Sequence, residues 1–499
     1  MLKGKVNTPH PDYTKLSPDW QQVRDAIEGE TTVKDSGEAY LPKPSGFNAQ
    51  SDNGTAMYEA YQKRAKFPEI MEPTQRGLTG VIHRIPAEIT LPEALEPMRE
   101  KATVDGLSLD AMHERITMEL FATGRYGILV DAPSDGEAEV PYLAGYPSES
   151  ILNWSSNGDF FVLDESGLVR EGFDWTDGES YRVLKLWDPE EDGGDEEDDK
   201  PSDDEETVEG ELKPSQVPEG AYVQLLYEGD NAEPTIIGPT IRGGKLMEEV
   251  PFTVVGSTDV SPDVDKIPLL GVVRAAFQMY RLDADYKWQL FMSGQETLFV
   301  FSNGDKEITT VGAGVSIKMP ADEGAHAEYV GPNCKGIEAH LKAIEREKTD
   351  AVQAGARMFD SEKKSAESGE ALSIRWSAQT ATLTTIALNS AKGLERSLKN
   401  AARMVGANPD DVSVVPNLQF IDTTLSAEEV NAIVKAWMAG AMSFETMYER
   451  FQAGGVSSQD RDVDEERELI SREAPDVSDD TGTGTGEDEP PLDDTGGDE

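Results

Sequence analysis

Apolar positions recur at helical spacing over two long stretches between Gly336 and Met404, and a short polar break separates the two. The first stretch is amphipathic, because charged residues occupy the face opposite its apolar ones, which are Ile337, Leu341, Ile344, Val352 and Phe359. The second carries many Ala, Ser and Thr residues, and small residues allow helices to approach closely. The break at residues 360–370 holds Lys363, Lys364 and a glycine, which predicts an exposed loop.

Helical spacing also recurs elsewhere along the chain. It predicts helices over residues 54–67, 107–122 and 267–291, and three short helices within residues 424–473. Ser108 or Asp110 is expected to cap the second of these helices. Near the N-terminus, a short helix is expected to begin at Ser17, with Pro18 in its first turn.

Alternating and continuous apolar runs predict strands between the helical stretches. A buried strand is expected from Tyr126 to Val130, and residues 140–260 contain short runs of antiparallel type, which are FFVLD, YRVLKLW, YVQLLYEG and VPFTVVGS. Further short strands, ETLFVF and GVSIKM, are expected within residues 295–335. This mixture of helices with locally connected strands predicts an α+β fold.

The chain is strongly acidic, with 45 Lys and Arg against 96 Asp and Glu and a formal charge of −51. Residues 188–211 hold fifteen of the acidic residues and fall between two strand candidates, which predicts a disordered hairpin loop. Solubility or adaptation to a salty habitat would explain the charge. The charge argues against tight static binding to nucleic acid, whereas a channel through which DNA slides would benefit from repulsive walls.

The sequence carries no recognisable catalytic, cofactor-binding or metal-binding constellation, so we do not expect an enzyme. It has no phosphate-binding loop and no nucleophile elbow. His113 and Glu114 could begin the HExxH motif of a zinc protease, but Thr117 occupies the position of the second histidine. His113 is therefore expected on a helix surface. Asp283 and Asp285 lie two apart in a helix and point to different faces, which predicts solvated carboxylates.

Three further observations concern disulfides, a signal peptide and membrane-spanning segments. Cys334 is the single cysteine, which excludes an intramolecular disulfide and a cysteine-based zinc site. The first residues lack the apolar core of a signal peptide. No apolar run is long enough to span a bilayer, so no membrane partner is expected.

Several strings together resemble the portal proteins of tailed bacteriophages, in the branch with a DUF4055-type domain. These strings are YQKRAKFPE, RGLTGVIHRIP, LFATGRYGILVDAP, YPSESILNW, ETLFVF and PLLGVVRAAFQMYRLDADYKWQLF. The resemblance covers roughly residues 40–470, and the acidic insertion and the acidic tail depart from the family pattern.

The resemblance implies a β-rich wing, two stem helices that flank a small α/β clip, a tunnel loop, a long tunnel-side helix and a helical crown. By position these are an N-terminal arm at 1–39, the wing at 40–264 with its disordered insertion at 188–211, the first stem helix at 265–294, the clip at 295–335, the second stem helix at 336–359, the tunnel loop at 360–371, the long helix with its return to the wing at 372–423, the crown at 424–473 and a disordered acidic tail at 474–499.

The function implied by this resemblance is a homo-dodecameric ring at one capsid vertex of the virion, assembled in the host cytoplasm. Its channel would pass double-stranded DNA during packaging, retention and ejection. The implied partners are other copies of the chain, terminase, a head-tail adaptor, and the major capsid protein or a scaffold; no cofactor is implied.

Lys363 and Lys364 are the candidate DNA-contacting residues, because a mainly negative channel needs a few cations to touch passing phosphates. Exposed loops carry lysine for other reasons as well, so an ordinary surface role explains them equally. Two alternatives to the portal reading are another structural virion or adaptor protein, and a metal-dependent nuclease suggested by the many carboxylates.

Overall fold

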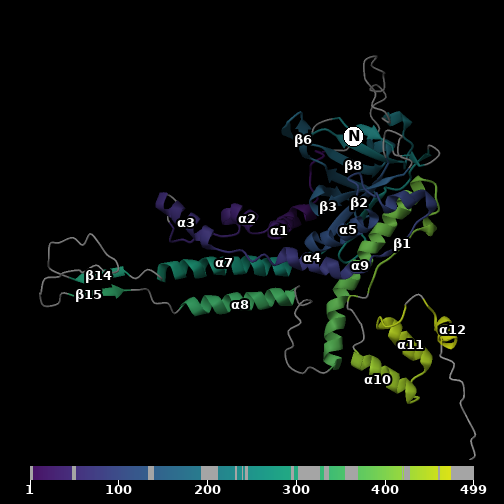
Figure 1. Cartoon of the computed structure of the whole chain (residues 1–499). Helices are drawn as coiled ribbons and strands as arrows, with labels where there is room; N and C mark the ends of the chain where they lie inside the picture. The colour runs from purple at the N-terminus through teal and green to yellow at the C-terminus, as the bar shows by residue number, and fades with distance from the viewer. Residues whose placement is uncertain are drawn as a thin grey trace, which may run out of the picture. The chain divides into compact units, whose positions relative to one another are not determined.

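The computed structural model describes residues 4–47, 52–132, 140–192, 212–230, 233–238, 240–241, 245–293, 297–301, 326–330, 336–354, 369–418, 420, 427–458 and 461–473. Contacts divide the chain into two compact units, Met1–Phe420 and Ile421–Glu499 (Figure 1). Each unit is described by itself.

The first unit begins with helices that pack into the main core. They are α1 (Pro11–Glu28), α2 (Glu30–Asp35), α3 (Asp52–Arg64) and α4 (Met71–Ile82), with a 3-10 turn at Gly37–Ala39. The predicted start of the first helix at Ser17 is wrong, because α1 already begins at Pro11. His10 Nδ1 accepts a hydrogen bond from the Asp12 amide, and Pro18 lies inside the helix. Burial of Trp20 in the core offsets the helix bond that this proline removes.

Helix α5 (Leu109–Thr123) starts and stops as its sequence predicts. Ser108 Oγ accepts a hydrogen bond from the Ala111 amide, which confirms Ser108 as the N-cap. At the other end Gly124 has a φ of 78° and accommodates the left-handed turn into the next strand. A 3-10 helix, Glu93–Arg99, precedes α5.

The β region contains two main antiparallel sheets, which confirms the α+β class. The three-stranded sheet has the order β13 (Phe252–Gly256), β2 (Arg125–Asp131), β3 (Tyr142–Pro147). The five-stranded sheet has the order β10 (Thr235–Ile237), β9 (Tyr222–Tyr227), β8 (Tyr181–Leu186), β5 (Phe160–Asp164), β4 (Ile151–Trp154). Smaller pairs are β6 (Gly167–Glu171) with β7 (Asp174–Gly178), β11 (Thr240–Ile241) with β12 (Lys245–Leu246), and β1 (Glu88–Thr90) with β16 (Ser413–Val415). Further 3-10 turns lie at Ser148–Ser150, Pro214–Gln216 and Pro409–Asp411.

The acidic insertion connects two strands that pair with each other. Strands β8 and β9 are antiparallel neighbours with Tyr181 opposite Tyr227, as expected for a hairpin. Just after β8, the turn α6 (Pro189–Asp192) is structured, and Asp192 Oδ2 lies 2.7 Å from Lys185 Nζ in a buried ion pair. The segment predicted to be disordered from residue 188 therefore starts with a fixed turn, while residues 193–211 lie outside the described part of the chain.

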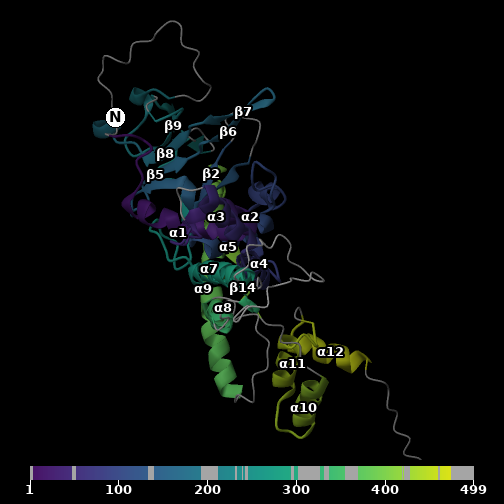
Figure 2. The ribbon, with the colours of Figure 1, turned by 90° about the vertical axis from the view of Figure 1, so that its left-hand side faces the viewer.

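After the β region, the chain forms α7 (Leu270–Ser293), a hairpin of β14 (Thr297–Phe301) with β15 (His326–Val330), and then α8 (Ile337–Ala354) and α9 (Gly369–Met404). Helices α7 and α8 run side by side in both views, and the hairpin lies beyond their shared end (Figures 1 and 2). The predicted strand GVSIKM lies outside the described residues.

The second unit contains three short helices, as its sequence predicts. They are α10 (Ala427–Met438), α11 (Phe444–Ala453) and α12 (Val463–Glu473). Ser443 caps α11 by accepting a hydrogen bond from the Thr446 amide. None of the described helices, in either unit, has the length and apolar character needed to cross a membrane.

Candidate functional site

The site expected from the sequence lies around the break between α8 and α9. Helix α8 ends at Ala354 and α9 begins at Gly369. Lys363 and Lys364 fall between these ends and lie outside the described residues, so their predicted role stays a prediction. The described parts of α8 and α9 show how these two helices are held.

Helix α8 packs along α7. Ala275 and Met279 on α7 pack with Ala351 on α8, and Ile344 joins this small apolar cluster. An added Cβ on Gly336 would lie 2.8 Å from Gln289 Nε2, so the first turn of α8 adjoins the last turns of α7. The two helices are therefore antiparallel, and α8 depends on α7 for its position.

Helix α7 joins this pair to the main core through its other face. Val273, Phe277 and Tyr280 are buried there, and the Phe277 ring stacks on Tyr40 with centroids 4.3 Å apart. Stacked aromatic pairs add to the energy of simple area burial. Helix α7 thus has one face in the core and a second face on α8.

Two carboxylates of α7 bind the segment around α3, which corrects the prediction that they are solvated. Asp285 Oδ1 accepts a hydrogen bond from Tyr61 Oη at 2.6 Å, and Asp283 Oδ2 accepts one from the Lys66 amide at 2.6 Å. Burial, the hydrogen bond to Asp285 and its charge together raise the pKa of Tyr61. Both carboxylates therefore meet protein groups of the segment around α3.

Helix α9 packs closely against the three-stranded sheet and α5. Leu383, Ile386, Leu394 and Leu398 are fully buried, as the helical spacing predicts. Gly393 lies against Val255 of β13 so closely that an added Cβ would overlap the Val255 methyl groups. The absence of a side chain at Gly393 therefore allows α9 to approach the sheet closely.

A buried polar contact fastens α9 to α5 and α4. His113 Nε2 lies 3.1 Å from Ser390 Oγ, and the His113 ring stands edge-on to His83 at 4.7 Å. The expectation that His113 lies on a surface is wrong, because the residue is 2% exposed. The signal was present in the sequence: His113 shares the apolar helix face of Leu109 and Ile116, at spacings of four and three residues.

Burial disfavours the charged form of both histidines. It lowers the pKa of His113 to about 3, with a further contribution from His83. Burial likewise lowers the pKa of His83 to about 4, which Asp110 partly opposes. Both rings are therefore neutral at pH 7, and the contact with α9 is made by an uncharged imidazole.

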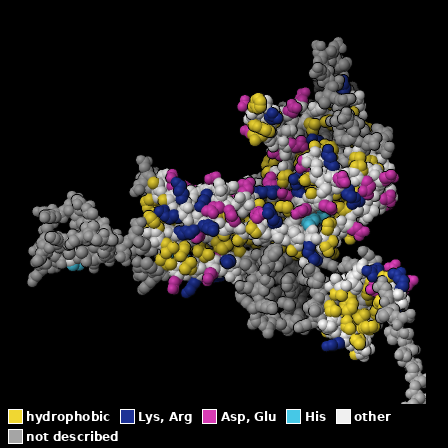
Figure 3. Space-filling model, viewed as in Figure 1, with side chains coloured by type: hydrophobic (Ala, Val, Ile, Leu, Met, Phe, Trp, Pro, Cys, Tyr) yellow, Lys and Arg dark blue, Asp and Glu magenta, His cyan; other side chains and the backbone are white. Residues whose placement is uncertain are grey.

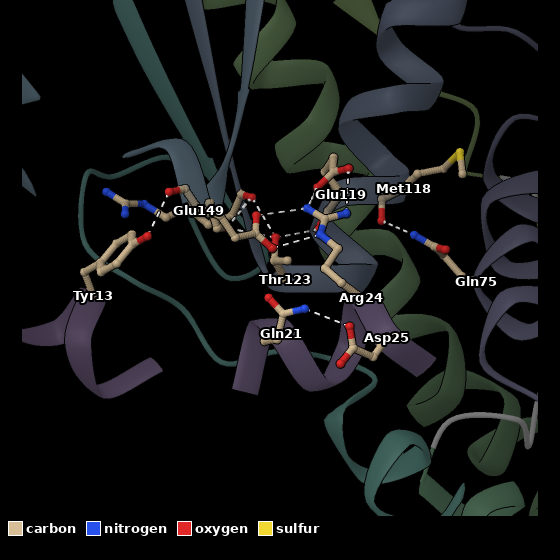
Figure 4. Close-up of polar contacts among 11 residues, drawn as sticks. Tyr13, Gln21, Arg24, Asp25, Gln75, Met118, Glu119, Thr123 and Glu149 are labelled. Atoms are coloured by element: carbon tan, nitrogen blue, oxygen red, sulfur yellow. Dashed lines mark hydrogen bonds and ion pairs between the residues drawn. The ribbon is translucent and has the colours of Figure 1, made fainter. Parts of the chain in front are cut away.

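The guanidinium of Arg24 joins the N-terminal helix α1 to α5 and to the 3-10 turn at Ser148–Ser150 (Figure 4). This residue is not among those that the sequence predicts to be functional. Arg24 Nη2 lies 2.5 Å from Glu119 Oε2, and Arg24 Nε lies 2.8 Å from Glu149 Oε1. Tyr13 Oη donates to the Glu149 carbonyl oxygen, so two residues of α1 meet at one turn. These partners are remote in sequence, and no local pattern indicates such a contact.

The described residues contain no group of three or more His, Cys, Asp or Glu side chains placed to hold a metal ion. The polar clusters present there are instead hydrogen-bonded pairs and networks between elements. These hydrogen-bonded pairs and networks hold the helices in position relative to the elements that they contact.

Comparison with known proteins places one family match on this part of the chain. Residues 268–405, which run from just before α7 to just after α9, match a family described as "Domain of unknown function (DUF4055)". The predicted resemblance to that domain type is confirmed over these residues. None of the curated proteins matches the chain.

Solved structures of gene transfer agent particles contain chains similar to this one. A chain in "Virion of native gene transfer agent (GTA) particle" is 12% identical, with a TM-score of 0.39, and the alignment covers 85% of this chain and 99% of that one. A chain in "Neck of empty GTA particle computed with C6 symmetry" is 10% identical, with a TM-score of 0.38 and coverages of 77% and 89%.

Proposed function

We propose that this chain is the subunit of a viral portal, a closed ring at one capsid vertex through which double-stranded DNA passes. The supporting observation is the order α7, β14–β15 hairpin, α8, connecting segment, α9 within the family-matched region. This order supports an assignment of these elements as stem helix, clip, stem helix, tunnel loop and long helix, which the sequence resemblance implies. In this assignment α9 anchors the tunnel loop, because its buried half is fixed to α5 and β13.

Exposed apolar side chains support assembly into a larger object. Hydrophobic side chains gather on the visible face of the α7 and α8 pair (Figure 3). On these two helices, Met292 of α7 is 51% exposed and Leu341 of α8 is 44% exposed, although Leu341 belongs to the apolar stripe of α8. Contiguous exposed apolar surface marks an interaction site in soluble proteins. A ring would cover these faces with neighbouring subunits.

The second unit shows the same property independently. Helix α10 carries an apolar stripe whose members are all at least partly exposed, namely Val430, Ile433, Val434, Trp437 and Met438. Met438 is 76% exposed, while the described residues of this unit bury few apolar side chains. Such small helical units usually need a partner surface for stability. In the proposed ring this unit forms the crown, where neighbouring subunits would provide such a surface.

The proposed role is structural, with no catalytic step and no cofactor. DNA would move past mainly acidic walls, with Lys363 and Lys364 as the cations that touch its phosphates. Terminase and a head-tail adaptor would bind at the clip, and the major capsid protein or a scaffold would surround the wing. The full ring would be a dodecamer.

Electron microscopy of the purified full chain, combined with native mass spectrometry, tests this proposal. The expected result is a closed ring with a central pore and a mass that is an integer multiple of the 54.5 kDa chain. Monomers across a range of protein and salt concentrations, or assemblies without a pore, would contradict the proposal.

A further inference from the structure

The exposed side of α9 carries a stripe of cations. The stripe begins at Leu388 and continues through Lys392, Arg396, Lys399 and Arg403, which follow one another at intervals of three or four residues and are exposed or partly exposed. Residues at this spacing share one face of a helix. Lys392, Arg396 and Arg403 are exposed, and the opposite face of the helix is buried in the core. We call these five residues the α9 face.

The charge of the α9 face is opposite to that of the chain as a whole. Four basic residues stand in the described side chains of α9 against one acidic residue, Glu395, whereas the complete chain has a charge of −51. Glu395 Oε1 pairs with Lys399 Nζ at 2.5 Å, and Glu395 Oε2 accepts a hydrogen bond from the Val414 amide. Arg403 Nη1 lies 3.2 Å from Glu249 Oε2, so Arg403 also has a carboxylate partner within the chain. Lys392 and Arg396 are the two cations of the α9 face that lack such an ion pair in the described part of the chain.

Lys392 and Arg396 form no ion pair or hydrogen bond with any residue that the structure describes. They lie one helical turn apart. Lys392 interacts electrostatically with Glu395, but that carboxylate is already paired with Lys399. Like charges at this spacing destabilise an isolated helix slightly. A negatively charged partner would convert this cost into an attraction.

Apolar surface beside the cations distinguishes between possible partners. Leu388 is 44% exposed on the α9 face, and Val415 is 56% exposed on β16, the strand that Glu395 contacts. Contacts to a phosphodiester backbone need charge and hydrogen-bond donors, whereas protein interfaces combine apolar side chains with arginine. The combination of Leu388, Val415 and arginine therefore favours an acidic protein surface over DNA.

We infer that the α9 face binds an acidic surface of a second copy of this chain. The inference rests on the proposed ring, which brings identical copies into lateral contact. Copies that each carry a charge of −51 repel one another, so a stable contact between them requires local charge of opposite sign. The α9 face supplies that charge next to exposed apolar groups.

Charge reversal on the α9 face tests the inference. The double substitution Lys392→Glu and Arg396→Glu is expected to raise the protein concentration needed for half-maximal assembly by at least about tenfold. Assembly is followed by native mass spectrometry and negative-stain electron microscopy. Circular dichroism and urea unfolding of the variant establish that the subunit still folds, as expected for substitutions at exposed helix positions.

A matched control separates local from global charge. Lys63→Glu with Arg76→Glu changes the net charge of the chain by the same amount, and both of these side chains are 79% exposed on α3 and α4. Assembly of this control is expected to stay within about twofold of the unaltered chain, because general repulsion is screened by salt beyond a Debye length.

The outcomes discriminate between the inference and the proposed function. Normal assembly of the α9 variant, or equal loss in both variants, overturns the inference while leaving the ring proposal intact. Normal assembly with loss of binding to a DNA duplex also overturns it, and assigns the α9 face to DNA. Absence of any ring from the unaltered chain overturns both.

Discussion

His113 on α5 and Ser390 on α9 lie 3.1 Å apart, between Nε2 and Oγ, in the interior of the first unit. Their hydrogen bond joins the helix that precedes β2 to the long helix that follows the proposed tunnel loop. The contact uses a neutral imidazole, because burial keeps the pKa of His113 at about 3. Stability of this junction is therefore linked to pH.

The first prediction concerns that linkage. Both histidines have folded-state pKa values, about 3 for His113 and about 4 for His83, below the value of about 6.5 for an unfolded chain. Their contribution to stability is complete above pH 6.5 and is lost as the pH falls toward these folded values. Each histidine should lower the free energy of unfolding by up to about 1.4 kcal/mol per pH unit below about pH 6.

Comparison of variants isolates this effect from the many carboxylates of the chain. His113→Gln keeps a hydrogen-bonding group near Ser390 and cannot titrate. Urea unfolding between pH 5 and pH 8 should show a shallower pH dependence for this variant than for the unaltered protein. Identical slopes for the two proteins would show that His113 is not buried as a neutral group.

A second prediction concerns the clamp on α1. Arg24→Met keeps most of the aliphatic length but leaves Glu119 and Glu149 without their common partner. Since the three groups are only partly buried, we expect a loss of about 1–3 kcal/mol in the free energy of unfolding.

A double-mutant cycle provides the control for the clamp. Glu119→Gln should cost less in the Arg24→Met background than in the unaltered protein, because the pair is already broken. Equal costs in both backgrounds would show that Arg24 and Glu119 contribute independently. Lys63→Met on α3, an exposed position, should leave stability almost unchanged.

A third prediction concerns the closest approach of α9 to the sheet. Gly393→Ala raises helix propensity by at most about 1 kcal/mol, but the new methyl group overlaps Val255. Because Gly393 and Val255 are both buried, the clash should outweigh the gain in helix propensity and destabilise the protein by about 1–3 kcal/mol.

The companion variant Val255→Ala decides whether the clash is the cause. It removes the methyl groups that Gly393→Ala would meet, so the alanine at 393 should cost much less in that background or become stabilising. The measurement is the coupling energy from urea unfolding of the four proteins. A coupling near zero would contradict the packing explanation.

Local signals in the sequence predicted much of this fold. The Ser108 cap and the strands of the β region depend on neighbouring residues, so a pattern over a few positions reveals them. The pairing of β8 with β9 followed from their separation by a charged insertion. These features need no knowledge of tertiary contacts.

The remaining features depend on groups that are distant in sequence. Pairing of Ile89 with Val414 and the Arg24 clamp unite residues that no short window contains. The early start of α1 was missed because Pro18 resembles a first-turn proline, whereas tertiary burial of Trp20 carries the helix through it. The burial of His113 is not indicated by the incomplete zinc-protease motif. It is indicated by the helix periodicity, which places His113 on the apolar face.

The last prediction concerns the proposed tunnel loop. If Lys363 and Lys364 touch DNA phosphates, Lys363→Glu with Lys364→Glu replaces two attractive contacts by repulsion within the channel. Rings should form normally, because the loop lies between α8 and α9 and outside the elements that hold α9 in place. Packaging or retention of DNA should fall, which is measured as the length of DNA protected inside assembled particles.

Two control variants accompany this test. Lys363→Gln with Lys364→Gln removes the charge without adding repulsion and should give a smaller loss of packaged DNA. Lys342→Glu with Lys348→Glu is the control for net charge, because it places the same charge change on exposed positions of α8. A salt series adds a physical criterion, since a loss caused by phosphate repulsion should diminish as ionic strength rises. Unchanged packaged length in intact particles of the Glu variant would remove both lysines from the mechanism while leaving the ring itself untouched.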